Sequence, residues 1–376
     1  RLLRRDNDPG LFFDSCFEHT FERAGTYTVE VRDARFLGSP HWRYVLRMGK
    51  FPVARVALPT AVIPGQQAGL KFPELPGLDM KSDVPPNQPL GGFYHAVRRA
   101  EDNASAWVSL LATSLPSVIE QEPNNKPEEA NRIDLAQDIN ARLELRGDID
   151  RFVFAGTKDQ SVVFTGITRQ QGSPADLNLK LLNKDGGQIA IVDDTGASEG
   201  VLVAKIPADG DYTLVVEDLA KRGGPNYAYR IAISPTAQPF TLAVSSDTAN
   251  LPLGGAVALT VTTVRNGYAG PIELSATGLP AGMTASRSVI GPGRNDAVMT
   301  LHAAPDQAAG VLSGLKVIGT AKVGDADVTD TANFAGALKA RLANMRFPPA
   351  TLTTAFAAAA APATGLTWRA DPPEII

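Results

Sequence analysis

The sequence predicts an all-β protein made of tandem β-sandwich modules. Its 376 residues exceed the roughly 100 to 200 residues of an ordinary domain. The 34 Gly and 28 Pro, together with 44% hydrophobic residues, are typical of a turn-rich globular chain. Short segments alternate apolar and polar residues with the period of two that marks half-buried strands. We therefore expect several modules, each with a core of its own.

An internal repeat at an offset of 185 residues supports this organisation. Residues 24–48 align without a gap on residues 209–233, with eight identities in 25 positions. The identical pairs are Gly25/Gly210, Tyr27/Tyr212, Thr28/Thr213, Val31/Val216, Asp33/Asp218, Gly38/Gly223, Pro40/Pro225 and Tyr44/Tyr229. Both copies alternate apolar residues on either side of a turn that contains Gly and Pro, which predicts strand, loop and strand. One type of module therefore occurs twice.

The repeat and the strand-like segments divide the chain into five parts. Residues 119–236 contain enough such segments for a complete sandwich of seven or eight strands, whereas residues 1–52 match only the C-terminal part of that module. Residues 53–118 are rich in Pro and Gly and predict a small, irregular β module. Residues 237–335 alternate again and predict an immunoglobulin-like sandwich. Residues 336–376 are rich in Ala and Pro and predict a linker or the start of a further module.

Charge and hydropathy exclude two classes of partner. The net charge is −4 and no long basic run occurs, so the sequence shows no electrostatic footprint for nucleic acid. The most apolar stretch, residues 354–366, is interrupted by Pro362 and is shorter than the roughly 20 residues that span a bilayer. We expect no membrane insertion in this segment. The first ten residues lack the apolar core of a signal peptide, so no export signal is visible.

No arrangement of residues predicts catalysis. Cys16 is the only cysteine, which leaves neither an internal disulfide nor a thiolate metal cluster. The segment 196–200 has the G-x-S-x-G form of a nucleophile elbow, but strand-like segments on both sides place Ser198 in a hairpin loop. Tyr227 and Tyr229 alternate on a predicted strand, where such aromatics belong to the core more often than to a binding strip. We therefore predict that the chain is not an enzyme.

Several motifs in residues 119–236 resemble the bacterial pre-peptidase C-terminal domain family, whose relatives include the collagen-binding domains of clostridial collagenases. The motifs are EQEPNN (120–125), RGDIDRFVF (146–154), DLNLKLLNKDGGQI (176–189), VDD (192–194) and PADGDYTLVVEDL (207–219). Residues 1–52 resemble the C-terminal half of the same family, and the whole layout resembles large surface proteins of planctomycete-type bacteria. The resemblance implies a jelly-roll-like sandwich in a secreted or cell-surface protein.

Calcium is the one ligand that the sequence indicates. Glu120, Glu122 and Asn124 alternate, so in an extended segment their side chains would point to one side, near a turn that carries Asp148 and Asp150. Ca²⁺ takes six to eight oxygen ligands of this kind. In the collagen-binding relatives such a segment and turn bind calcium, and the matching positions here are Glu120, Glu122, Asn124, Asn125, Asp148 and Asp150. The alternative is that these are solvated polar residues of a linker and a turn.

The sequence thus predicts a non-catalytic, extracellular array of binding or adhesion modules that is stabilised by calcium. Its partner would be an extracellular polymer, a protein or a component of a cell surface. Two alternatives stay open. The modules could be structural spacers, or they could form the accessory region of a secreted peptidase whose catalytic domain lies outside this chain.

Overall fold

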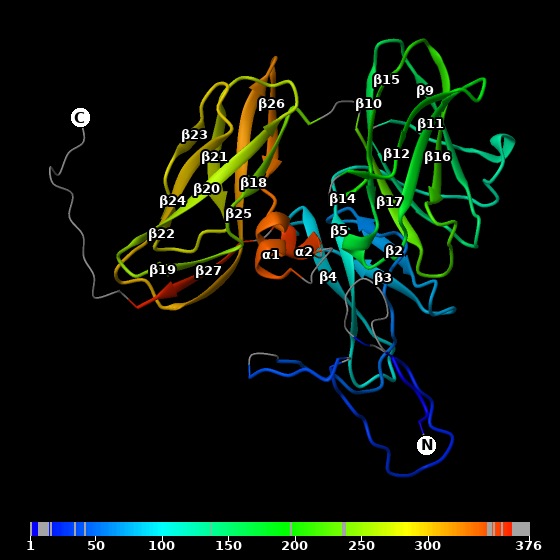
Figure 1. The fold of residues 1–376 in the computed structure, drawn as a ribbon, viewed down its shortest axis with the longest axis horizontal. Coiled ribbons are helices and arrows are strands. Elements are labelled where there is room, and N and C mark those ends of the chain that lie inside the picture. The colour runs from blue at the N-terminus through cyan, green and yellow to red at the C-terminus, as the bar shows by residue number, and fades with distance from the viewer. Residues whose placement is uncertain are drawn as a thin grey trace. The chain divides into compact units, whose positions relative to one another are not determined.

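A computed structural model describes residues 2–6, 15, 17–33, 35–40, 43–135, 137–195, 198–234, 238–343, 348, 350–354 and 356–362. Strands make up 45% of the chain and helices 5%, which confirms the predicted all-β fold. The chain divides into two compact units, Arg1–Thr236 and Ala237–Ile376, at one of the predicted boundaries (Figure 1). Among the described residues, no helix has the length and apolar composition needed to cross a membrane. The boundaries predicted after residues 52 and 118 stay predictions.

The first unit begins its regular structure with a small β module. Its strands are β1 (Ala61–Val62), β2 (Gln67–Lys71), β3 (Asp79–Asp83), β4 (Gly91–Val97) and β5 (Ala106–Ala112). Strands β1, β5 and β4 form one sheet in that order, and β2 and β3 form a hairpin. Alternation along β5 buries Val108 and Leu110 on the side of the module's own core, where Leu70 and Phe72 also lie. The module therefore has a hydrophobic core separate from that of the sandwich that follows.

Residues 117–234 form a sandwich of two five-stranded sheets. In sheet order, one contains β15 (Val201–Lys205), β10 (Ser161–Ile167), β17 (Ala228–Ser234), β8 (Asp138–Arg142) and β6 (Ser117–Ile119). The other contains β12 (Gln188–Val192), β11 (Leu177–Asn183), β16 (Gly210–Asp218), β9 (Asp150–Gly156) and β7 (Asn131–Arg132). The connections hold the hairpin β13 (Asp194–Thr195) and β14 (Ser198–Glu199) and the 3₁₀ turns η1 (Pro127–Glu129) and η2 (Arg169–Gln171).

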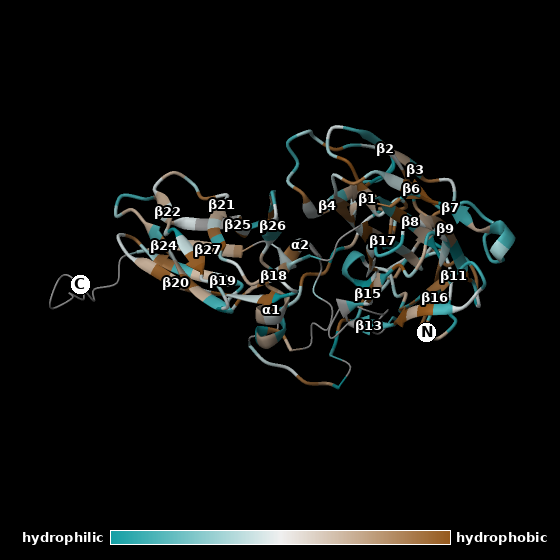
Figure 2. Cartoon of the chain, turned by 90° about the horizontal axis from the view of Figure 1, so that it is seen from above, coloured by the Kyte–Doolittle hydropathy of each residue, from teal (hydrophilic) through white to brown (hydrophobic). Residues whose placement is uncertain are grey.

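Alternating apolar residues of the two sheets meet in one core. Along β16, Tyr212, Leu214 and Val216 point inward and are at most 4% exposed. The strand lies between β9 and β11, with Tyr212 opposite Phe154, and both pairings are antiparallel. Apolar residues concentrate in the strands, and many connecting loops are polar (Figure 2). The period of two in the sequence thus sets which side chains of this sandwich are buried.

The first copy of the repeat does not form the predicted strands. No described residue of 24–48 belongs to a strand. Tyr27 and Tyr44 are 40% and 71% exposed, whereas their counterparts Tyr212 and Tyr229 are 4% and 0% exposed. A strand needs neighbours for its backbone hydrogen bonds, and the described residues of 24–48 pair with no strand. The prediction of strand, loop and strand is therefore wrong for the described residues of this range.

The second unit is also built from two sheets. One contains β18 (Phe240–Val244), β20 (Ala256–Arg265), β24 (Asp296–Ala303) and β22 (Met283–Ala285) in that order. The other contains β19 (Thr248–Pro252), β27 (Phe356–Ala361), β25 (Gly310–Val323), β21 (Ile272–Thr277) and β23 (Ser288–Ile290), and β26 (Ala326–Thr331) pairs with β25. Two short helices, α1 (Ala335–Arg341) and α2 (Ala350–Thr353), precede β27. Its immunoglobulin-like topology stays a prediction.

Strand β27 comes from the Ala-rich segment that the sequence predicts to be a linker. It pairs in parallel with β19 and antiparallel with β25, so it fills an interior position of the sheet. Phe356, Ala358 and Ala360 are at most 5% exposed and belong to the unit's core. Strand β27 is therefore part of the second sandwich, which corrects the prediction of a linker or a further module for residues 356–361. Residues 363–376, the rest of the predicted linker, lie outside the described residues.

Candidate metal centre

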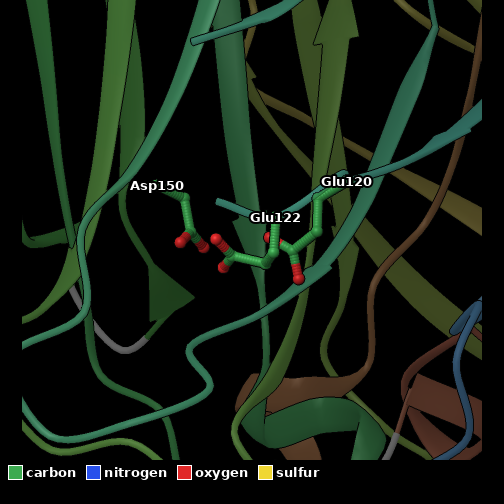
Figure 3. A group of neighbouring side chains, drawn as sticks. All are labelled: Glu120, Glu122 and Asp150. Carbon is green, nitrogen blue, oxygen red and sulfur yellow. The ribbon is translucent and has the colours of Figure 1, made fainter. Parts of the chain in front are cut away.

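Three of the predicted calcium ligands meet at one end of the first unit's sandwich. Glu120 and Glu122 follow strand β6, and Asp150 is the first residue of β9. The backbone N–H of Glu120 donates to the carbonyl oxygen of Asn140 at 3.1 Å, which holds the segment along strand β8. One carboxylate oxygen from each of the three residues lies within 4.8 Å of the others (Figure 3). The structure thus brings together residues from two segments 28 or more positions apart in the sequence.

Two oxygens in this cluster are buried and accept no hydrogen bond from the described residues other than the one that the Glu120 and Asp150 carboxyl groups can form with each other. Glu120 Oε1 accepts from the backbone N–H of Arg142 at 2.5 Å, which leaves Oε2. Asp150 is fully buried, and its Oδ2 accepts from the hydroxyl of Tyr229, which leaves Oδ1. Each of these two residues therefore keeps one carboxylate oxygen for a ligand.

Burial shifts all three carboxyl groups toward their protonated forms when no cation is bound, because the pKa of each is raised. Burial, followed by the negative charge of Asp150, raises the pKa of Glu120 to about 10. Burial also raises the pKa of Asp150 to about 8, although the hydrogen bond from Tyr229 acts in the opposite direction. The pKa of Glu122 is raised as well, first by burial. A divalent cation at this position would replace the protons and satisfy the charges.

Asn124 adds an independent indication of a ligand. Its side chain is fully buried, and neither its Oδ1 nor its Nδ2 has a hydrogen-bond partner among the described residues. Its backbone N–H donates to Oε2 of Glu122 at 2.9 Å, so the residue adjoins the cluster. A buried carboxamide without partners costs free energy, and an amide oxygen is a ligand that Ca²⁺ uses.

The other two predicted ligands support a turn. Oδ1 of Asn125 accepts from the backbone N–H of Ile149 at 2.7 Å. Asp148 Oδ2 accepts from the backbone N–H of Glu144 at 2.5 Å, and its Oδ1 accepts from Ile149 at 3.2 Å. The charge of Asp148 also contributes to the raised pKa of Asp150, which indicates that the turn lies beside the cluster. These two residues position the site, and each oxygen already has a partner.

Sequence analysis missed Tyr229 as part of this site. The residue is a core aromatic, as predicted, but its hydroxyl also donates to Asp150. Burial first, and then the charge of Asp150, raise the pKa of Tyr229 well above its usual value, so the hydroxyl stays a donor. No local signal in the sequence could show this contact, because β17 and β9 belong to different sheets.

A second acidic cluster, Asp176, Asp194 and Glu199, also has three carboxylates within 4.8 Å of one another. Here the guanidinium group of Arg169 forms an ion pair with each of the three. The sequence does not indicate this group, because Asp176 and Arg169 lie in a segment separate from the hairpin in which Asp194 pairs with Glu199. We interpret it as an ion-pair cluster around one arginine, since the guanidinium supplies the positive charge.

The G-x-S-x-G segment lies in a hairpin. Ser198 begins β14, which pairs with β13, and the next described element is strand β15. Residues 196 and 197 lie outside the described part of the chain. A nucleophile elbow requires a helix after the serine, so the geometry around Ser198 does not match one.

No family model matches this chain, and no curated protein sequence matches it significantly. Similar solved structures include the pre-peptidase C-terminal domain of a collagenase from Bacillus anthracis. That domain is 24% identical, with a TM-score of 0.23 over 30% of this chain and 100% of that one. Another is the M60 catalytic domain with the CBM51-1 and CBM51-2 domains of Clostridium perfringens ZmpB. It is 9% identical, with a TM-score of 0.22, and the match covers 64% of this chain but 26% of that one. With such low TM-scores, these likenesses carry no conclusion about activity.

Proposed function

We propose that this chain is a non-catalytic, extracellular array of β-sandwich modules whose complete sandwich binds a calcium ion. The observation that carries the calcium site is the set of buried oxygens without hydrogen-bond partners, on Glu120, Asn124 and Asp150. In this proposal the array binds an extracellular polymer, a protein or a cell-surface component. The sequence resemblance of residues 119–236 to secreted bacterial modules supports this role and location.

The donor set fits a hard divalent cation. Glu120, Glu122 and Asp150 supply carboxylate oxygens, and Asn124 supplies an amide oxygen. Ca²⁺ prefers oxygen ligands and accepts irregular arrangements, whereas sites for softer metals use imidazole or thiolate. The remaining positions in its coordination shell would be filled by water. Because the ion would compensate buried negative charge, its role in this proposal is to stabilise the fold.

Calcium titration of the chelator-treated full chain tests the site. Calorimetry should show binding, and the melting temperature should rise with Ca²⁺, because a ligand of the native state at 100 times its Kd adds about 2.7 kcal/mol. Asp150→Asn should remove the binding heat. Glu128→Gln changes an exposed carboxylate in the nearby turn η1 and serves as the matched control. No heat and an unchanged melting curve at roughly millimolar calcium would overturn the site.

Retention of the full chain on immobilised ligands tests the binding role. Collagen, polysaccharides and cell-wall material represent the three classes of partner. Retention on one of them that persists at about 0.5 M salt, where exposed charges are screened, supports the proposal. A chain that is retained on none of them would instead act as a spacer or as the accessory part of a larger secreted enzyme.

A further inference from the structure

The buried residue Asn140 of strand β8 bonds the small β module to the sandwich. Its side-chain Oδ1 accepts three hydrogen bonds from the loop that leads into β1. The donors are the backbone N–H of Thr60 at 2.9 Å, the Thr60 hydroxyl at 3.0 Å and the backbone N–H of Ala61 at 3.2 Å. On the other side of the loop, the carbonyl oxygen of Thr60 accepts from Nε2 of Gln171 at 2.8 Å. Both Asn140 and Thr60 are at most 3% exposed.

The same asparagine also holds the segment that carries the carboxylate cluster. Its carbonyl oxygen accepts from the backbone N–H of Glu120, and its Nδ2 donates to the hydroxyl of Ser117. Ser117 is the first residue of β6, the edge strand that pairs in parallel with β8 and leads directly to Glu120. Asn140 therefore bonds to the cluster's segment through its main chain and its amide nitrogen, and to the small module through its amide oxygen.

We propose that Asn140 couples cation binding at the carboxylate cluster to the docking of the small β module, so that the bound ion stiffens the joint. This inference rests on the proposed cation site. Without the ion, protons neutralise the buried carboxyl groups, and no shared cation ties Glu120 and Glu122 to Asp150, so the segment is held less firmly at the sheet edge. Release of β6 removes Ser117 from Nδ2 of Asn140. The freed carboxamide then no longer presents its oxygen to Thr60 in one fixed orientation.

The geometry favours this path because every step is a short-range contact. Strand β6 has three residues and lies at the edge of its sheet, so few hydrogen bonds hold it. The amide plane of Asn140 is rigid, so fixing its nitrogen also fixes its oxygen. Three donors on one oxygen make the joint sensitive to that orientation, since hydrogen bonds weaken steeply with misalignment. The ion would thus set how firmly one module is held by the other.

Hydrogen exchange of the full chain, with calcium and with chelator, tests the coupling. Calcium should slow exchange in residues 117–126, which lie at the site, and also in residues 58–62 of the small module. We expect roughly tenfold slowing at the second location, the factor that corresponds to the net free energy of about one hydrogen bond. Calorimetry on the same preparations shows whether calcium binds.

Two variants distinguish calcium binding itself from its effect on the docking of the small β module. Asn140→Leu removes the shared amide, and the milder Ser117→Ala removes only its anchor and keeps the fold testable if Asn140→Leu does not fold. Both should still bind calcium and slow exchange at 117–126, but should lose the slowing at 58–62. The matched controls are Asn178→Leu on β11 and Ser161→Ala at the start of β10, which lie outside the joint. Both controls should behave like the parent chain.

The outcomes distinguish this inference from the site on which it rests. Calcium binding that slows exchange at 117–126 and leaves 58–62 unchanged in the parent chain would overturn the coupling and leave the site intact. Coupling that survives in Ser117→Ala and Asn140→Leu would overturn the role of Asn140. Absence of calcium binding would overturn the site and this inference together.

Discussion

Asp33 and Asp218 occupy equivalent positions in the two copies of the repeat, and each organises the same turn. In both copies Oδ1 accepts from the backbone N–H groups two and four residues further on. The distances are 2.9 and 3.0 Å in the first copy and 3.0 Å for both bonds in the second. The residues three positions on, Phe36 and Lys221, both have a φ of 57°. The turn thus forms in the same way whether or not strands flank it.

The contacts around the turn differ completely. A Cβ added to Gly223 would lie 2.0 Å from the carbonyl oxygen of Leu145, whereas a Cβ on Gly38 would have nothing within 4 Å. Val216 is fully buried and its counterpart Val31 is 47% exposed. Short-range hydrogen bonds need only the residues of the turn itself. Strand pairing and side-chain burial need the rest of a sandwich, which only the second copy has in this structure.

The largest difference between the copies should follow removal of a core side chain. Leu214 is fully buried, and its counterpart Val29 is 50% exposed. Leu214→Ala should lower the free energy of unfolding of the first unit's sandwich by about 3 kcal/mol. Val29→Ala should change it by less than about 0.5 kcal/mol. Urea denaturation of the full chain, read from hydrogen exchange in residues 209–233, measures both. Equal losses of unfolding free energy in Leu214→Ala and Val29→Ala would show that residues 24–48 are also packed.

The next largest difference in stability should follow substitution of the glycine that both copies share, Gly38 and Gly223. Gly223→Ala should destabilise the sandwich by about 2 kcal/mol, because the new methyl group meets a backbone atom that cannot move aside freely. Gly38→Ala should have almost no effect, since the space around it is open. The same denaturation experiment provides the comparison. If Gly223→Ala is as stable as the parent chain, the backbone around Leu145 can shift to accommodate the methyl group.

The tyrosines should differ in their dependence on pH. In the metal-free chain, Asp150 has a pKa of about 8 when folded and about 4 when unfolded, so its contribution to stability is fully present below about pH 4 and is lost as pH rises from about 4 to about 8. Tyr229→Phe removes the donor that favours the charged form, so the pKa of Asp150 should rise further. We expect a loss of about 1.5 kcal/mol at about pH 9 and a smaller loss at about pH 5. Tyr44→Phe should show no such pH dependence in the same titration.

The smallest effect should follow removal of the side-chain acceptor in the turn of the first copy. Asp33→Ala removes the side-chain acceptor of the first turn, and exchange of the amide of Leu37 should speed up by roughly tenfold. Asp33→Asn keeps an acceptor oxygen and should change little. Residue-resolved hydrogen exchange by NMR measures both variants. If the alanine variant exchanges like the parent chain, the turn of the first copy depends on contacts other than Asp33.

Local alternation was sufficient to predict the fold class and the strands of residues 119–236. It failed for residues 24–48, because the pattern describes a strand's faces and says nothing of whether neighbours exist. It also failed for β27, since Ala has little β propensity and an Ala-rich segment with nearby Pro indicates a linker. There the strand forms because β19 and β25 supply backbone hydrogen-bond partners along both of its edges.

In the candidate site, too, some residues could be predicted from the local sequence and others depend on tertiary packing. Glu120, Glu122 and Asp150 could be proposed from the sequence because alternation and motif resemblance act over short segments. The hydroxyl of Tyr229 and the unpartnered amide of Asn124 depend on how separate strands pack, so only the structure reveals them. Asn125 and Asp148 have the right chemistry for calcium, yet their side-chain oxygens already accept from the backbone N–H groups of Glu144 and Ile149.

The position of β27 has a consequence for how the second unit is made. Ribosomes deliver the chain from its N-terminus, and domains generally fold as units. Because β27 lies between β19 and β25, more than 100 residues of this unit are synthesised before the strand that joins them. Until Ala361 has left the ribosome, β19 and β25 each present an unpaired edge. The second unit must therefore complete its folding after translation has passed that point, and its unpaired edges are open to chaperones or to neighbouring chains during this interval.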